Sequence, residues 1–384
     1  MASNINQRIN SIDMMRGLVM VIMVLDHVRE RFFLHQQVSD PMDINTTPPA
    51  LYFSRLAAHL CAPTFVFLTG LSAWLYQHSG PTGQRPLPGF LLKRGLFLIA
   101  LEVTLITFSW MGNYHTLYLQ VMWAIGLSMV ALALLQYLPR WSLVVIAIGL
   151  VFGHNALTPI QFAPNEWGYS AWTILHDRGY LISDSSLNVK VSYPLLPWIG
   201  VIVFGYLAGP LYSKVMDSDT RQSWLLRLGV GSLALFAVLR GGNIYGETLP
   251  WQQGDTLLIS VMSLLNLTKY PPSLAFLLLT LGLMFLGLRQ MERLSSPWSQ
   301  AAAKVLTQFG GAPMFFYLLH LYLLLLLYQI AEAIWGANHG ELFGVSSIVQ
   351  VWLISVALVL ALYWPSKTIA AFKRRTQRQW VKYL

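Results

Sequence analysis

Long apolar segments recur along the whole chain and constrain its fold more than any other feature. Only 11% of the 384 residues are charged, whereas a soluble globular protein carries about 25%. The hydrocarbon core of a bilayer is about 30 Å thick, so a helix needs about 20 apolar residues to cross it. The segments that meet this requirement are residues 12–33, 57–77, 90–110, 117–137, 141–159, 195–213, 222–240, 272–289, 312–334 and 347–369. The sequence therefore predicts an all-α fold, a polytopic membrane bundle of about ten transmembrane helices.

The basic residues predict the orientation of this bundle. The chain has 25 Lys and Arg against 16 Asp and Glu. With the N-terminus inside, most of the basic residues fall in cytoplasmic segments, as the positive-inside rule requires. An even number of spans places the C-terminus inside too (N-in/C-in), with residues 370–384 as a basic cytoplasmic tail. The net charge then reflects membrane orientation, and we expect membrane lipid as a partner and no nucleic acid.

No soluble domain fits between the spans, so residues 1–384 are expected to form a single transmembrane domain. The only cysteine is Cys61, which excludes an intrachain disulfide and a cysteine metal cluster. We expect no bound metal.

The first span carries ionisable side chains, which are costly in a bilayer and are candidates for a functional site. Arg16 and His27 are separated by three helical turns, share one helix face and differ in depth by about 16 Å. Arg16 then lies near the inner surface and His27 in the outer half of the membrane, where a neutral imidazole can act as a general base. Asp26 could raise its basicity, although adjacent side chains point about 100° apart on a helix. Alternatively, Asp13 and Arg16 only begin the helix and His27 is a packing residue.

These residues also carry a resemblance to a known family. Arg8-Ile9-Asn10-Ser11-Ile12-Asp13-Met14-Met15-Arg16-Gly17 followed by Asp26-His27 resembles the opening of the heparan-α-glucosaminide N-acetyltransferase-like family, in its bacterial branch. Further matches run in order along the chain: His59-Leu60-Cys61-Ala62-Pro63-Thr64-Phe65, Lys93-Arg94-Gly95 with Glu102, Trp123-Ala124-Ile125-Gly126-Leu127-Ser128, Leu196-Pro197-Trp198-Ile199-Gly200, Lys269-Tyr270-Pro271-Pro272-Ser273 and Phe316-Tyr317-Leu318-Leu319-His320.

The resemblance implies a multi-pass acyltransferase of the bacterial inner (cytoplasmic) membrane. Such an enzyme moves an acyl group, by resemblance acetyl, from cytoplasmic acetyl-CoA to an extracytoplasmic sugar or glycan acceptor. Some relatives carry Asn in place of His27, and their proposed catalytic His lies in the outer loop that follows. His35 is the nearest candidate for that role here, so His27 and His35 both remain candidate bases.

Other ionisable residues have both a functional and a structural interpretation. Lys93 and Arg94, with Arg16, could hold the phosphates of a cytoplasmic donor. Arg94 and Glu102 share a helix face and could instead form an ion-pair network between helices.

His59 and His320 are either residues that support a site or packing residues. Pro63 removes the helical partner of the His59 carbonyl, so a kink is expected there. Lys269 and Tyr270 begin the eighth span on the outer side, where a positive charge beside a helix N-terminus suits an oxyanion or an anionic acceptor.

Two other classes of function remain open. A transporter of sugars or small metabolites would use Asp26, His27, Arg94 and Glu102 as a proton or substrate path. A scaffold without turnover would leave these residues unexplained.

Small residues such as Gly205 and Gly209 suit close helix packing, either within one chain or in a homodimer. The sequence leaves open the acceptor, and whether transfer is direct or passes through an acyl-histidine.

Overall fold

The computed structural model describes residues 2–79, 85–184 and 186–376, and these form two compact units. Unit 1 consists of Met1–Cys61, Ser109–Gly112 and Gly287–Leu384, and unit 2 of Ala62–Phe108 and Asn113–Leu286. The end of the expected basic tail, residues 377–384, lies outside the described residues. The expectation of one transmembrane domain stays a prediction.

The protein is mostly helical, and at least six of its helical segments can cross a membrane by length and composition. These segments are Pro49–Gln77, Arg140–Leu157, Ser218–Gly241, Leu274–Glu292, Pro313–Trp335 and Ile348–Arg375. The other expected spans also lie largely on helices, which are α1 (Ala2–Phe32), the run from α4 (Leu87–Leu101) to α5 (Thr107–Met111), α6 (Val121–Leu135), and α9 (Leu196–Leu207) with η4 (Gly209–Tyr212). The count of about ten spans and the N-in/C-in orientation stay predictions.

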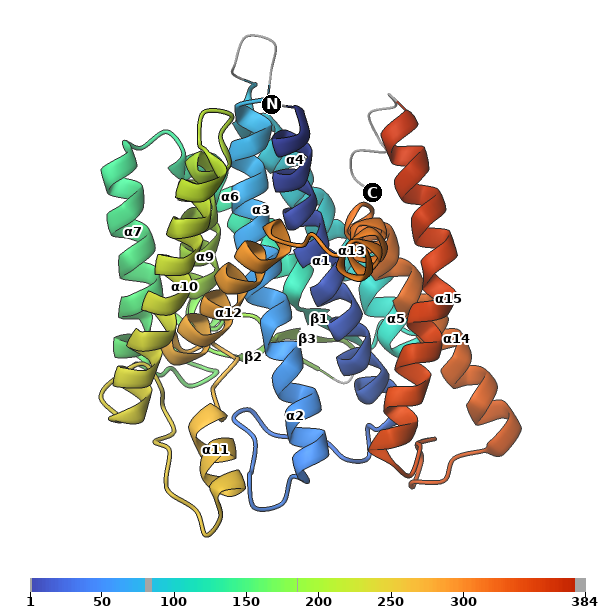
Figure 1. The fold of residues 1–384 in the computed structure, drawn as a ribbon. Coiled ribbons are helices and arrows are strands. Elements are labelled where there is room, and N and C mark those ends of the chain that lie inside the picture. Colours follow the sequence, from blue (N-terminus) through green and yellow to red (C-terminus); the bar gives the residue numbers. More distant parts are fainter. Residues whose placement is uncertain (1, 80–84, 185, 377–384) are drawn as a thin grey trace. The chain divides into compact units, whose positions relative to one another are not determined.

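Unit 1 is built around α1. This helix contacts α13 (Pro297–Gly310), α14 (Pro313–Trp335), α15 (Ile348–Arg375) and α2 (Pro49–Ala57). Figure 1 shows α13 end-on where α1 runs upright, so the two helices cross. Glycines permit this crossing, because a Cβ on Gly17 would clash with the Leu306 carbonyl and one on Gly310 with the Asp13 carbonyl. The crossing fixes the N-terminal half of α1.

Unit 2 contains the remaining helices. They are α3 (Cys61–Gln77), α4, the π-helical turn η2 (Glu102–Ile106), α6, α7 (Arg140–Gly153), η3 (His154–Leu157), α8 (Tyr169–Leu175), α9, η4, α10 (Ser218–Gly241), α11 (Leu257–Leu265) and most of α12 (Leu274–Glu292). Small residues again allow close approach, since Gly205 lies against the Phe67 backbone and Gly209 against Trp74. These two glycines therefore serve packing of α9 and η4 against α3 within the chain.

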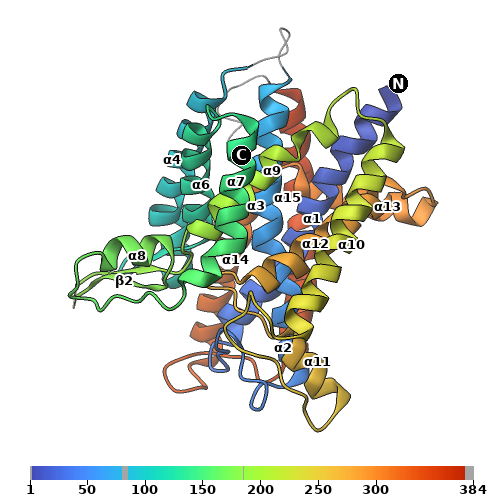
Figure 2. The same ribbon diagram turned by 90° about the vertical axis from the view of Figure 1, so that its left-hand side faces the viewer.

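A three-stranded sheet in unit 2 departs from the all-α expectation. Its order is β1 (Thr116–Leu119), β3 (Asn188–Val191), β2 (Gly179–Ser183), with β1 parallel and β2 antiparallel to β3. Figure 2 shows β2 beside α8 at the edge of this unit. The expected span 117–137 therefore begins as a strand and becomes helical only at Val121. Hydropathy could not reveal this, because the partner of β1 lies in a distant loop.

Large apolar side chains are exposed along several helices, as expected where helices face lipid. On α15 these are Trp352, Leu353, Val356, Leu360 and Trp364, each at least 40% exposed. Such a stripe is costly in water but not in hydrocarbon. Together with the spanning helices, it identifies the chain as an integral membrane protein.

Candidate active site

His27 on α1 forms a hydrogen bond with His320 on α14. The distance from His27 Nδ1 to His320 Nε2 is 2.7 Å, and the two rings lie nearly parallel, with an interplanar angle of 15°. His320 is fully buried. Both residues belong to unit 1. The structure thus joins two histidines that the sequence presented as separate candidates.

The partner of the other His320 nitrogen indicates the tautomers of this pair. His320 Nδ1 lies 2.9 Å from the carbonyl oxygen of Phe316, one helical turn earlier. A carbonyl oxygen only accepts hydrogen bonds, so Nδ1 carries the proton and, in the neutral ring, Nε2 carries the lone pair. His27 Nδ1 must then donate to His320 Nε2. The lone pair of neutral His27 is therefore on Nε2, where it can take a proton from a reactant.

Two aromatic rings hold His27 in this orientation. The Trp110 ring lies edge-on at 5.2 Å between centroids, and the Tyr317 ring edge-on at 6.0 Å. Trp110 lies at the end of α5, next to Ser109, whose carbonyl oxygen accepts a hydrogen bond from Arg31 at 2.6 Å. Trp110 and Arg31 were not among the site residues expected from the sequence. For Arg31 a signal existed, because it lies four residues after His27 and so on the same helix face.

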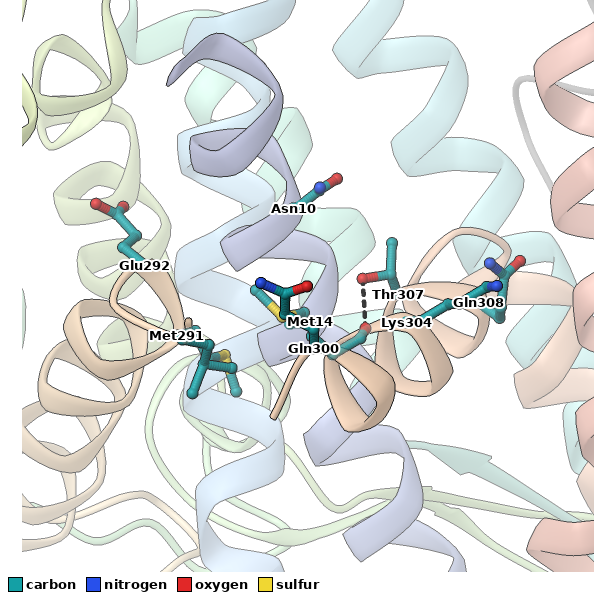
Figure 3. A pocket seen from close by; sticks show the side chains of 10 residues that line it. Asn10, Met14, Met291, Glu292, Gln300, Lys304, Thr307 and Gln308 are labelled. Carbon is teal, nitrogen blue, oxygen red and sulfur yellow. Dashed lines mark hydrogen bonds between the residues drawn. The ribbon is translucent and has the colours of Figure 1, made fainter. Parts of the chain in front are cut away.

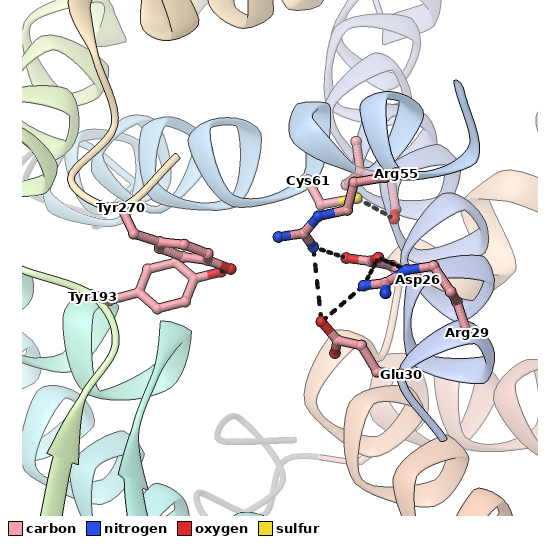
Figure 4. Close-up of polar contacts among 8 residues, drawn as sticks. Asp26, Arg29, Glu30, Arg55, Cys61, Tyr193 and Tyr270 are labelled. Atoms are coloured by element: carbon pink, nitrogen blue, oxygen red, sulfur yellow. Dashed lines mark hydrogen bonds and ion pairs between the residues drawn. The ribbon is translucent and has the colours of Figure 1, made fainter. Parts of the chain in front are cut away.

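Asp26 belongs to a cluster of four charged residues (Figure 4), in which Asp26, Arg29 and Arg55 are buried and Glu30 is partly exposed. Its Oδ1 accepts hydrogen bonds from Arg29 at 2.8 and 3.0 Å, and its Oδ2 accepts one from Arg55 at 3.0 Å. Glu30 lies 3.2 Å from Arg29 and 3.7 Å from Arg55. Two carboxylates thus balance two guanidinium groups. Asp26, which precedes His27 in the sequence, balances the charges of Arg29 and Arg55. A catalytic role for its carboxylate stays a prediction.

His35 lies in the loop after α1 and stacks on His339. The ring centroids are 3.6 Å apart and the planes differ by 5°. Gly344 packs against the stack, because a Cβ there would lie 2.5 Å from His35 Nδ1. His35 remains the second candidate base, held by a different set of contacts from those of His27.

The His35–His339 stack should make this loop sensitive to pH. Partial burial and the neighbouring His339 lower the pKa of His35, so the folded loop favours the neutral ring. Its contribution to stability is complete above the ordinary histidine pKa of about 6.5. It is lost as the pH falls toward the lowered value. The protection factors of amides 33–36 against hydrogen exchange should therefore fall more between pH 7.5 and pH 5 in the wild type than in His339→Gln. An equal response in both proteins would contradict this prediction.

The N-terminal half of α1 carries the donor-binding candidate Arg16. Arg16 forms an ion pair with Asp13 at 2.8 Å, and both side chains are partly exposed. A cavity of about 430 Å³ opens close by, lined by Asn10, Met14, Met291, Glu292, Leu294, Gln300, Ala303, Lys304, Thr307 and Gln308. Figure 3 shows these side chains around the space between α1, the end of α12 and α13. The amide, hydroxyl and ammonium groups suit a polar ligand.

His59 is buried in the 3₁₀ turn η1 (Ala58–Leu60) between α2 and α3. The regular helix changes geometry just before Pro63, where the kink was expected. The structure thus places His59 in the connection between α2 and α3. A role for His59 in a site stays a prediction.

In unit 2, Glu102 serves as a cap for α6. Its Oε2 accepts hydrogen bonds from the backbone N–H groups of Met122 at 2.8 Å and Trp123 at 3.0 Å. A carboxylate is favourable at the positive end of a helix. Lys93 is exposed and Arg94 half-buried on α4, and donor binding by both stays a prediction.

Lys269 and Tyr270 form a cationic aromatic cluster in unit 2. The Tyr270 ring lies edge-on to Tyr193 at 4.9 Å, and their hydroxyl oxygens are 3.3 Å apart; Figure 4 includes both rings. Lys269 Nζ lies 5.1 Å from the Tyr270 ring centroid, and the Arg178 guanidinium carbon 4.9 Å from it. Two cations beside two phenols suit a polar or anionic acceptor.

Residues 8–240 match the sequence model of the family described as heparan-alpha-glucosaminide N-acetyltransferase, catalytic. The match covers more than half of the chain and includes His27, whereas His320 lies beyond its end. No curated protein matches the chain.

Proposed function

We propose a function from the family to which this chain belongs, the heparan-alpha-glucosaminide N-acetyltransferase catalytic family of transmembrane acetyltransferases. In this proposal, the protein transfers an acetyl group from cytoplasmic acetyl-CoA to a sugar or glycan on the outer side of the membrane. The observation that carries this proposal is the His27–His320 pair, whose tautomers place a lone pair on His27 Nε2. A positioned imidazole is the group that acyl transfer to a hydroxyl or amine needs.

In the proposed reaction His27 acts as the general base. Its Nε2 takes the proton of the acceptor hydroxyl or amine as that oxygen or nitrogen attacks the thioester carbonyl carbon. The tetrahedral intermediate then expels the sulfur of coenzyme A, which receives the proton from His27. Throughout, His320 accepts the hydrogen bond from His27 Nδ1 and stabilises the imidazolium. Direct transfer by this route needs no acyl-enzyme.

We further propose that the protein lies in the bacterial inner membrane in the N-in/C-in orientation. The donor then approaches from the cytoplasm. The distribution of Lys and Arg supports the orientation. Arg16, Lys93 and Arg94 are the proposed phosphate contacts, and the cavity beside Met14 offers polar groups on the same half of α1. Arg16 and His27 differ in depth by about 16 Å, a distance that the extended pantetheine arm of coenzyme A can bridge.

The test is transfer by the purified protein in proteoliposomes. Labelled acetyl-CoA is supplied on one side and amino sugars on the other, and labelled acetyl sugar is measured. We expect acetyl sugar to form only when both reactants are present. A protein that neither binds coenzyme A nor transfers acetyl would refute the proposal. Sugar accumulation in vesicles without acetyl-CoA would favour the transporter instead.

His320 should act by positioning His27. His320→Phe keeps the size of the ring but removes the acceptor for His27 Nδ1–H, which orients the catalytic histidine. We expect kcat to fall by about a hundredfold, the lower end of what a general base contributes. KM for acetyl-CoA should change little, and the pH dependence of kcat should shift. His320→Gln is the matched variant, because its amide oxygen can accept the same hydrogen bond and should restore part of the rate. A fully active His320→Phe protein with the wild-type pH profile would contradict this role.

A further inference from the structure

Arg31 is a buried cation one helical turn beyond His27. The residue is 8% exposed, and its Nη2 donates a hydrogen bond to the Ser109 carbonyl oxygen. The guanidinium carbon lies 5.9 Å from the Trp110 ring centroid and 5.6 Å from that of Tyr328. Arg31 therefore sits between two aromatic rings, one of which also contacts His27.

The charge of Arg31 is balanced differently from that of its neighbours. Arg29 and Arg55 share the carboxylates of Asp26 and Glu30. Among the residues that the structure describes, no carboxylate lies within ion-pair distance of Arg31. A buried cation beside one neutral carbonyl is costly in a membrane protein, and such residues mark functional sites.

Two hydrogen-bond donors on these neighbouring side chains also lack acceptors. Arg31 Nε and Trp110 Nε1 are both buried, and neither has an acceptor within the described part of the chain. Leaving a buried N–H without an acceptor costs free energy. Both atoms only donate, so a group that satisfies them must accept, and the positive charge favours one that is negative.

We propose that Arg31 and Trp110 bind a negatively charged oxygen of a reactant beside His27. This inference rests on the proposed function, because it places the reactants at His27. The oxygen has two possible sources with the same chemistry. One is a carboxylate, sulfate or phosphate substituent of the acceptor sugar. The other is the thioester carbonyl oxygen, which becomes negative when the acceptor attacks. In a site shielded from water, either interaction is strong.

Trp110→Phe is the sharpest variant, because it keeps an aromatic ring against His27 and Arg31 and removes only the N–H. Its matched control is Trp298→Phe, since Trp298 is 88% exposed on α13. Arg31→Gln removes the charge, and Arg31→Lys keeps it but removes Nε. Should the Arg31 variants fail to fold without the bond to Ser109, Trp110→Phe still tests the site.

The measurement compares glucosamine with glucosamine 6-phosphate as acceptors. If the oxygen belongs to the acceptor, Trp110→Phe and Arg31→Gln should raise KM for the phosphorylated sugar about tenfold more than they raise KM for glucosamine. If it is the thioester oxygen, both variants should lower kcat with both sugars. Arg31→Lys should lose less than Arg31→Gln in either case. Wild-type kinetics in both Trp110→Phe and Arg31→Gln would overturn the proposal.

A second readout does not depend on turnover. Without acetyl-CoA, glucosamine 6-phosphate should raise the melting temperature of the wild type and of Trp298→Phe, but not that of Arg31→Gln, if the acceptor carries the anion. A wild type that transfers no acetyl group would refute the proposed function, and the anion site would then be judged by this stabilisation. If glucosamine 6-phosphate also failed to stabilise that inactive wild type, the anion site would be overturned as well.

Discussion

Replacing His27 with alanine should lower kcat for acetyl transfer by about a hundredfold to ten-thousandfold, the range that a general base contributes. The reason is that His27 Nε2 is the atom proposed to take the acceptor proton, and alanine offers no substitute at that depth in the membrane. The measurement is the initial rate of labelled acetyl transfer at saturating acetyl-CoA. Binding of acetyl-CoA should persist, because Arg16, one of the proposed phosphate contacts, lies three helical turns before His27 on α1.

His35→Ala is the matched control, since it removes the second candidate histidine from the same part of the chain. It should keep transfer near the wild-type rate. If His35→Ala loses transfer and His27→Ala keeps it, the base is His35 and the His27–His320 pair is a structural contact. Burst kinetics with an acetylated histidine would show that transfer passes through an acyl-enzyme.

The second large effect is expected on stability, at Asp26. Asp26→Asn removes the carboxylate that contacts both Arg29 and Arg55, and the Glu30 side chain beside them is 34% exposed. Removing one partner of a buried ion pair costs about 3–5 kcal/mol, because the remaining charge stays buried without compensation. The free energy of unfolding in detergent should fall by that amount. Removing a charge from Arg55 as well, in Asp26→Asn with Arg55→Gln, should recover part of the loss.

Glu341→Gln serves as the control for this change, since Glu341 is an exposed carboxylate in the same unit. It should leave the free energy of unfolding nearly unchanged, as surface substitutions usually do. An Asp26→Asn protein as stable as the wild type would show that the cluster does not need this carboxylate. Full loss of transfer in a stable Asp26→Asn protein would instead indicate a catalytic role.

Much of the protein follows from local properties of the sequence. Hydropathy located the long apolar helices, because the transfer of apolar side chains into lipid depends on each segment alone. Helical periodicity placed Arg16 and His27 on one face and at different depths, since α1 is an uninterrupted helix through both residues. The ordered motifs from Arg8 onward identified the family, which the match over residues 8–240 confirms.

The partners of the site residues were decided only by the tertiary structure. His320 is 293 positions from His27, and Arg55 reaches Asp26 from another helix. Trp110 meets His27 at the end of α5, where helical periodicity carries no information about a contact with α1. In the small sheet, β1 pairs with β3 across more than seventy residues. Burial demands that a polar side chain find a partner, but only the packing of whole helices determines which side chain is close enough to be that partner.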